Sequence, residues 1–86
     1  MAEKEEVGEV THFFNKISVA VVKVTGNMKV GDRISIEGQG DVVEQTVDSM
    51  QIDKKPIDEA NPGDDIGMKT DGPVKAGYKV FKIIEE

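Results

Sequence analysis

The strongest constraint on the fold is a two-residue repeat of apolar side chains, broken by Gly, Asn, Asp and Pro roughly every 8 to 12 residues. No segment shows the 3.6-residue repeat of an amphipathic helix. Alternation with period two is typical of strands that bury one face. The sequence therefore predicts an all-β domain, with strands at residues 7–14, 17–24, 33–37, 42–53, 66–68 and 78–84.

Two of these segments depart from simple alternation. Residues 17–24 are apolar on both alternating faces, with Ile17, Val19 and Val21 on one and Ala20, Val22 and Val24 on the other. This pattern predicts a central strand with both faces covered. In residues 42–53 the apolar phase shifts between Val47 and Met50, which predicts a β-bulge that bends the strand.

Size and composition limit the kind of protein. A chain of 86 residues allows one domain. The absence of Cys excludes disulfides, zinc–thiolate sites and thiol catalysis. No apolar run is long enough to span a bilayer, and the acidic N-terminus is unlike a signal peptide. We therefore expect a cytoplasmic protein without a membrane partner, with a flexible acidic N-terminus at 1–6 and a single domain at 7–86.

Charge is unevenly distributed along the chain. The net charge of −6 argues against nonspecific DNA binding, which depends on neutralising phosphates. Residues 10–36 carry a net charge of +3, whereas residues 37–65 carry −7. This asymmetry could orient a partner, and an ordinary solvated surface is the simpler alternative.

Motifs for catalysis or cofactor binding are missing from the sequence. There is no P-loop, so a GTPase site is excluded. His12 is the only histidine, and neither Ser18 nor Ser35 lies in a nucleophile motif. The paired carboxylates near residue 64 lack calcium-loop spacing. We expect no catalytic residue, no metal and no cofactor. A flavin-binding barrel is a minor alternative, because the sequence contains no loop that would bind the flavin phosphate.

Four segments resemble motifs in the second domain of translation elongation factor Tu. They are residues 26–32 with the Val-Gly-Asp turn, residues 47–51, residues 60–67 with Ala-x-x-Gly-Asp, and residues 74–80 with Tyr78 replacing the usual Asp. The resemblance covers residues 7–84 and implies a stand-alone elongation-factor-like protein. The implied fold is a small six- to seven-stranded antiparallel Greek-key barrel. Residues 12–16 and 49–52 also resemble barrels appended to collagenase-like peptidases.

The resemblance implies a non-enzymatic binding module whose partner is the ribosome, tRNA or another translation-related protein. The alternative is a protein–protein adaptor, like the barrel appended to collagenase-like peptidases. The candidate partner-binding residues are His12, Phe13, Phe14, Lys16, Lys23, Lys54 and Lys55. Aromatic rings can stack on unpaired bases and lysines can contact phosphates, whereas packing and solvation explain the same residues without a ligand.

Seven further residues are expected to have structural roles in turns. They are Gly26, Gly31, Asp32, Gly63, Asp64, Gly67 and Gly77. Glycine permits tight turns, and an aspartate carboxylate can accept backbone N–H groups and hold the turn.

Overall fold

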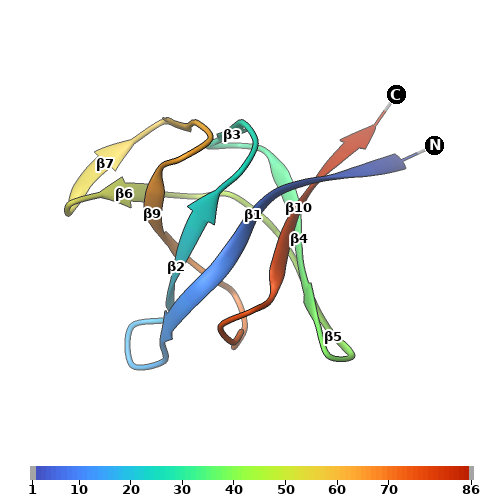
Figure 1. Cartoon of the computed structure of the whole chain (residues 1–86), viewed down its shortest axis with the longest axis horizontal. Coiled ribbons are helices and arrows are strands. Elements are labelled where there is room, and N and C mark those ends of the chain that lie inside the picture. Colours follow the sequence, from blue (N-terminus) through green and yellow to red (C-terminus); the bar gives the residue numbers. More distant parts are fainter. Residues whose placement is uncertain (1, 86) are drawn as a thin grey trace.

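The computed structural model describes residues 2–85, which form strands and turns and contain no helix (Figure 1). The ten strands are β1 (Ala2–Phe14), β2 (Val19–Val24), β3 (Met28–Lys29), β4 (Arg33–Gly38), β5 (Asp41–Thr46), β6 (Met50–Ile52), β7 (Lys55–Ile57), β8 (Glu59–Ala60), β9 (Asp65–Lys69) and β10 (Lys79–Glu85). The prediction of an all-β domain is confirmed.

Eight of the strands form one antiparallel sheet in the order β5-β4-β10-β1-β2-β9-β6-β7. A separate two-stranded sheet joins β3 to β8. The large sheet coils around the core, but its terminal strands β5 and β7 are not paired with each other (Figure 1). The sheet is therefore not closed, and the expected Greek-key barrel of six to seven strands is not confirmed. The strand predicted at 17–24 is shorter, and the one predicted at 42–53 is divided in two.

Strand β1 is the longest and links the two halves of the sheet. Its first part pairs with β10 and its second part with β2. Register shifts lie between Glu6 and Gly8 and between Val10 and His12, and such irregularities bend a strand. The strand begins at Ala2, earlier than the predicted residue 7, because Glu3 to Glu6 pair through their backbone with β10. Met1 lies outside the described residues, and the flexibility of residues 1–6 stays a prediction.

The long strand predicted at 42–53 is divided into β5 and β6. Val47 lies between them and is buried. Its N–H donates to the Asp32 carbonyl at 2.9 Å, and its carbonyl accepts the Gly31 N–H at 2.9 Å. Val47 therefore bonds to a turn instead of a neighbouring strand. For this reason the strand is interrupted here, where the sequence predicted a bulge within one continuous strand.

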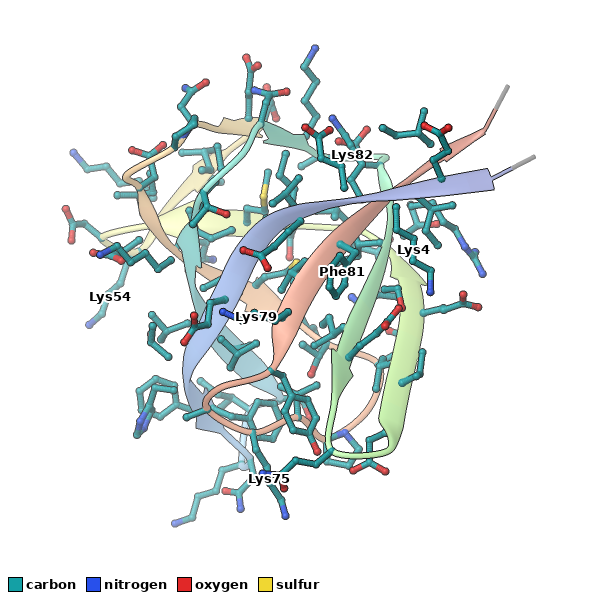
Figure 2. The ribbon with its side chains drawn as sticks, turned by 45° about the vertical axis from the view of Figure 1, so that its right-hand side comes forward. Lys4, Lys54, Lys75, Lys79, Phe81 and Lys82 are labelled. Carbon is teal, nitrogen blue, oxygen red and sulfur yellow. The ribbon has the colours of Figure 1, made fainter. Side chains whose placement is uncertain are left out.

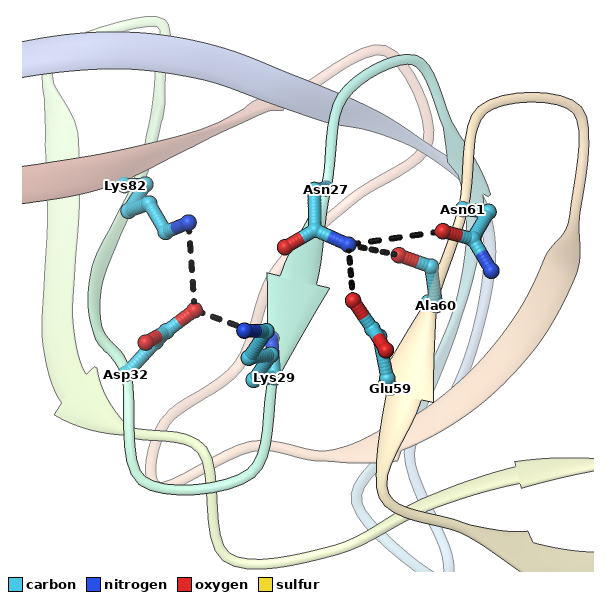
Figure 3. Close-up of polar contacts among 7 residues, drawn as sticks. All are labelled: Asn27, Lys29, Asp32, Glu59, Ala60, Asn61 and Lys82. Atoms are coloured by element: carbon cyan, nitrogen blue, oxygen red, sulfur yellow. Dashed lines mark hydrogen bonds and ion pairs between the residues drawn. The ribbon is translucent and has the colours of Figure 1, made fainter.

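Two turns are built in the same way. The Asp32 carboxylate accepts the Lys29 N–H, and the Asp64 carboxylate accepts the Asn61 N–H, both at 2.9 Å. The glycine before each aspartate has a φ of 98° or 97°. Figure 3 shows the first turn, where Lys82 also approaches Asp32, at 3.5 Å. Beside it, the Asn27 side chain donates to groups of β8 and the adjoining turn.

Other glycines of the predicted turn set have different surroundings. Gly26 lies in the bend after β2, and Gly77 has a φ of 98° in the turn before β10. Gly67 lies within β9, so its placement at a turn was wrong. Gly67 pairs with Val21, and a Cβ atom at position 67 would lie 3.4 Å from a Val19 methyl carbon, which is an ordinary contact distance.

The inner face of the coiled sheet encloses a single core. The fully or almost fully buried apolar residues are Val7, Val10, Ala20, Val22, Val24, Met28, Ile34, Ile36, Val47, Met50, Ala60, Ile66, Met68, Val74, Tyr78 and Val80. Because the sheet is one layer around one core, each strand has a single inner face. The outer faces are left to solvent or to partners.

Candidate functional site

The loop between β1 and β2 forms a shallow apolar hollow on the surface. Its volume is about 410 Å³, and its lining residues are His12, Phe13, Phe14, Asn15, Lys16 and Ile17. The rings of His12 and Phe14 meet edge to face, with their centroids 4.5 Å apart. Phe14 is 47% exposed and Ile17 61% exposed, although both side chains are large and apolar. Exposed apolar groups gathered in this way are typical of binding sites.

Backbone contacts hold this loop in place. The Ile17 N–H donates to the Phe14 carbonyl at 3.3 Å, which closes the turn. The Thr70 N–H donates to the Ser18 carbonyl at 2.8 Å and ties the loop to the segment after β9. Ser18 has a φ of 55°, in the left-handed region that few non-glycine residues adopt. The hollow is thus formed by an anchored loop.

The apolar surface continues from the hollow along the outer face of β2. Val19 and Val21 alternate with the buried Ala20 and Val22, so they point away from the core. Val19 pairs with Phe14, and Val21 pairs with His12, on the neighbouring strand. We call His12, Phe14, Ile17, Val19 and Val21 the outer strip.

The outer strip corrects one expectation about β2. The sequence predicts a central strand with both faces covered, and β2 does lie between β1 and β9. Only its inner face is buried in the core, whereas Val19 and Val21 are half-buried among the described residues. The reason is the single-layer architecture, which provides no second layer above β2.

The lysines near the outer strip differ in their surroundings. Lys16 lines the hollow, and Lys69 pairs with Val19 across the sheet. Lys23 lies at the far end of β2, between Glu9 on β1 and Asp65 on β9. The ion pairs within residues 2–85 are formed by other lysines, namely Lys4, Lys79 and Lys82.

The candidate residues of the sequence are thus only partly brought together. His12, Phe13, Phe14 and Lys16 share one hollow. Phe13 also packs against the core, so it has a structural role as well. Lys54 and Lys55 lie at the hairpin between β6 and β7, separated from the loop by β2 and β9 in the sheet (Figures 1 and 2). Val19 was missed as a site residue, although apolar residues on both faces of its segment were the available signal.

A second surface covers the outer side of β4, β5 and β10. A hollow of about 380 Å³ there is lined by the β4–β5 hairpin together with Lys79 and Phe81, which Figure 2 shows along β10. Lys4 forms an ion pair with Glu37 and holds the pKa of that carboxyl below its ordinary range, with a further hydrogen bond from a serine. Lys79 forms an ion pair with Glu9, and the hydrogen bond between the two side chains raises the pKa of Lys79. Lys4 and Lys79 of this surface are thus paired with carboxylates of the same domain.

The side chains that could contribute to catalysis or metal binding have the following surroundings among the described residues. No group of three or more His, Asp or Glu side chains could hold a metal within residues 2–85. The Ser35 hydroxyl is buried and donates to Glu37, and His12 lies against Phe14. That part of the chain also contains no helix that could cross a membrane.

Comparison with known proteins relates the chain to peptidases. No protein-family model matches the sequence. It is 37% identical over 83 residues to the uncharacterized protease MJ0090 of Methanocaldococcus jannaschii. That alignment covers 95% of this chain but only 20% of the protease. The chain therefore corresponds to about a fifth of that relative.

Two crystal structures share the fold. Both are of the C-terminal domain of a Geobacillus thermoleovorans protein proposed to be a U32 peptidase, and one is its selenomethionine variant. The TM-scores are 0.84 for the variant and 0.85 for the other, with 18% sequence identity in each case. They cover 88% and 91% of this chain, and 96% and 91% of the respective domains.

These matches correct the interpretation from the sequence. The identification as a stand-alone protein like elongation factor Tu was wrong, because the similar proteins are a protease and the C-terminal domain of a proposed U32 peptidase. The function in translation, with the ribosome or tRNA as partner, depended on that identification and was wrong as well. A fold does not determine a function, so the Gly-Asp turns indicated the all-β fold but not the function. The alternative, a domain like those appended to peptidases, is better supported.

Proposed function

We propose that this chain is a non-catalytic protein-binding domain that works together with a peptidase. The observation that carries the proposal is the 37% identity to the protease MJ0090 along 95% of this chain. Because the alignment covers a fifth of the protease, the rest of that protein is available for the hydrolytic chemistry. The shared fold with a peptidase C-terminal domain supports an accessory role.

The surface chemistry favours binding over catalysis. The hollow at the β1–β2 loop joins aromatic, aliphatic and lysine side chains, which suits contact with a polypeptide. The carboxylates of Glu9 and Glu37 are engaged in ion pairs, and the single histidine contacts a phenylalanine ring. A cytoplasmic location, expected from the absence of Cys, belongs to the same proposal.

The test separates binding from hydrolysis. The intact chain is titrated by calorimetry into the M. jannaschii protease from which the matching 83 residues have been deleted. Saturable binding is expected, since the chain resembles the deleted part. In parallel, the chain alone is incubated with fluorescein-labelled casein, and no hydrolysis above the buffer rate is expected. Hydrolysis by the chain alone would overturn the non-catalytic assignment, and absence of binding would overturn the association with a peptidase.

A further inference from the structure

The outer face of β2 is more apolar than the packing of this domain requires. A strand with one face in the core and one in solvent ordinarily alternates apolar with polar residues. In β2, however, Val19 and Val21 occupy outer positions, while the core is filled from the inner side. Phe14 and Ile17 extend the same apolar surface into the loop. Among the described residues this surface is only partly covered, since Val19 and Val21 are half-buried and Phe14 and Ile17 are exposed.

The outer strip has the geometry of a preorganised binding site. Aromatic residues, Phe included, are enriched at protein interfaces, where a few side chains carry most of the binding energy. The loop is anchored by the bond from Thr70 to Ser18, so little ordering is needed when a partner binds. The hollow of about 410 Å³ has room for apolar side chains from a partner.

The charge around the outer strip selects the chemistry of the partner. From Val10 to Gly31 the sequence contains no Asp or Glu, although the whole chain has a net charge of −6. Lys16 lines the hollow and Lys69 pairs with Val19. Neither lysine is among those that form the ion pairs of the described residues. Complementary charge steers a partner and fixes its orientation, so an acidic partner is favoured.

We propose that the outer strip, flanked by Lys16 and Lys69, binds an acidic segment of a partner polypeptide that inserts an apolar side chain into the hollow. This inference rests on the proposed function, because it names the surface that a protein partner contacts. A nucleic acid fits less well. Lys23 lies between Glu9 and Asp65, so the lysines do not form a continuous row along which a phosphate backbone could run.

The first experiment measures the chemistry of the ligand with the intact chain. Fluorescence anisotropy is followed for three labelled peptides, made of alternating Glu and Leu, Glu and Ser, or Lys and Leu, and for oligouridine. The Glu–Leu peptide is expected to bind, and to bind about tenfold more tightly than the Glu–Ser peptide. Added salt should weaken its binding, because the lysines contribute through charge. Equal or tighter binding of the Lys–Leu peptide or of oligouridine would overturn the proposal.

The second experiment locates the site with matched variants. Phe14→Ser and Lys16→Glu change exposed side chains of the loop. Val42→Ser likewise replaces an exposed apolar side chain by serine, on β5, where Val42 is 59% exposed. Lys54→Glu makes the same charge reversal as Lys16→Glu, on the β6–β7 hairpin. The loop variants should lose about tenfold in affinity for the Glu–Leu peptide, whereas the control variants should change it less than about twofold. Equal losses in both pairs would contradict the assignment.

Two further measurements complete the test. Thermal unfolding of each variant should match that of the unaltered chain, which separates a lost contact from a lost fold. Sedimentation of the chain alone should show a monomer; a dimer that dissociates in Phe14→Ser would assign the strip to a second copy and overturn the proposal.

The truncated protease distinguishes this proposal from the proposed function. If the protease binds the chain and Phe14→Ser does not weaken that binding, the assignment of the outer strip is wrong while the proposed function stands. If neither the unaltered chain nor any variant binds the truncated protease, the proposed function itself is wrong.

Discussion

The ring of Tyr78 lies directly against Gly38, so closely that a Cβ atom at position 38 would be 2.2 Å from Cδ1 of the ring. Tyr78 is 3% exposed, and its hydroxyl donates to the Asp41 carboxylate at 2.8 Å. The tyrosine thus joins the turn before β10 to the β4–β5 hairpin. It stands where the resemblance to elongation factors led us to expect an aspartate, and its packing explains why this position differs from the other two Gly-Asp turns.

Gly38→Ala is therefore expected to destabilise the domain. The methyl group would have to displace a buried ring, and overpacking of this kind costs about 1–3 kcal/mol of unfolding free energy. Urea unfolding followed by circular dichroism measures the loss. Gly72→Ala is the matched control, since its Cβ would lie 3.4 Å from the nearest atom, a Val43 methyl carbon. Equal effects of the two substitutions would show that the tyrosine ring is not the cause.

The Tyr78–Asp41 pair also gives a prediction on pH. The hydrogen bond to Asp41, and then burial, raise the pKa of Tyr78 above its ordinary value of 10.0. Because the folded-state pKa is raised, the contribution to stability is complete below pH 10.0 and is lost as pH rises through the folded-state pKa. Tyr78 is the only tyrosine, so ultraviolet titration of the phenol reports its pKa directly.

Asp41→Ala should lower that titration midpoint toward the ordinary value, because it removes the largest cause of the shift. Glu44→Ala, which removes another exposed acid of β5, is the control and should leave the midpoint nearly unchanged. A midpoint in the unaltered chain at or below the ordinary value would show that the hydrogen bond is not formed in solution.

The two Gly-Asp turns allow a comparison within one molecule. Asp32→Ala and Asp64→Ala each remove a carboxylate that accepts a backbone N–H, and a hydrogen bond to a charged group contributes about 1.5–3 kcal/mol. We expect similar losses in unfolding free energy at high salt, measured by urea unfolding. At low salt Asp32→Ala should cost slightly more, because Lys82 lies 3.5 Å from the Asp32 carboxylate. A loss confined to one of the two variants would contradict the equivalence of the turns.

The sequence was sufficient for the strand content and most turns, because period-two alternation and Gly-Asp pairs depend on local chemistry. The open sheet could not be predicted, since strand order depends on pairing between distant segments such as β4 and β10. Of the candidate site, the cluster from His12 to Lys16 was predicted because its residues are consecutive. Val19 and Lys69 were not, because their proximity arises only when β2 pairs with β9.

Gln45 compensates for part of the missing closure of the sheet, and its removal gives the last prediction. This buried side chain of the edge strand β5 donates to the Lys69 carbonyl at 2.9 Å and accepts the Asp71 N–H at 2.7 Å. Gln45→Ala would remove both hydrogen bonds, and since each contributes about 0.5–1.5 kcal/mol, the two together contribute about 1–3 kcal/mol. Urea unfolding should show a loss in that range, and hydrogen exchange should quicken at the Asp71 amide. Gln51→Ala, at an exposed position in β6, is the control. Unchanged exchange at Asp71 would mean that another group, or water, already satisfies this amide, and that the contact from β5 does not hold the end of β9 in place.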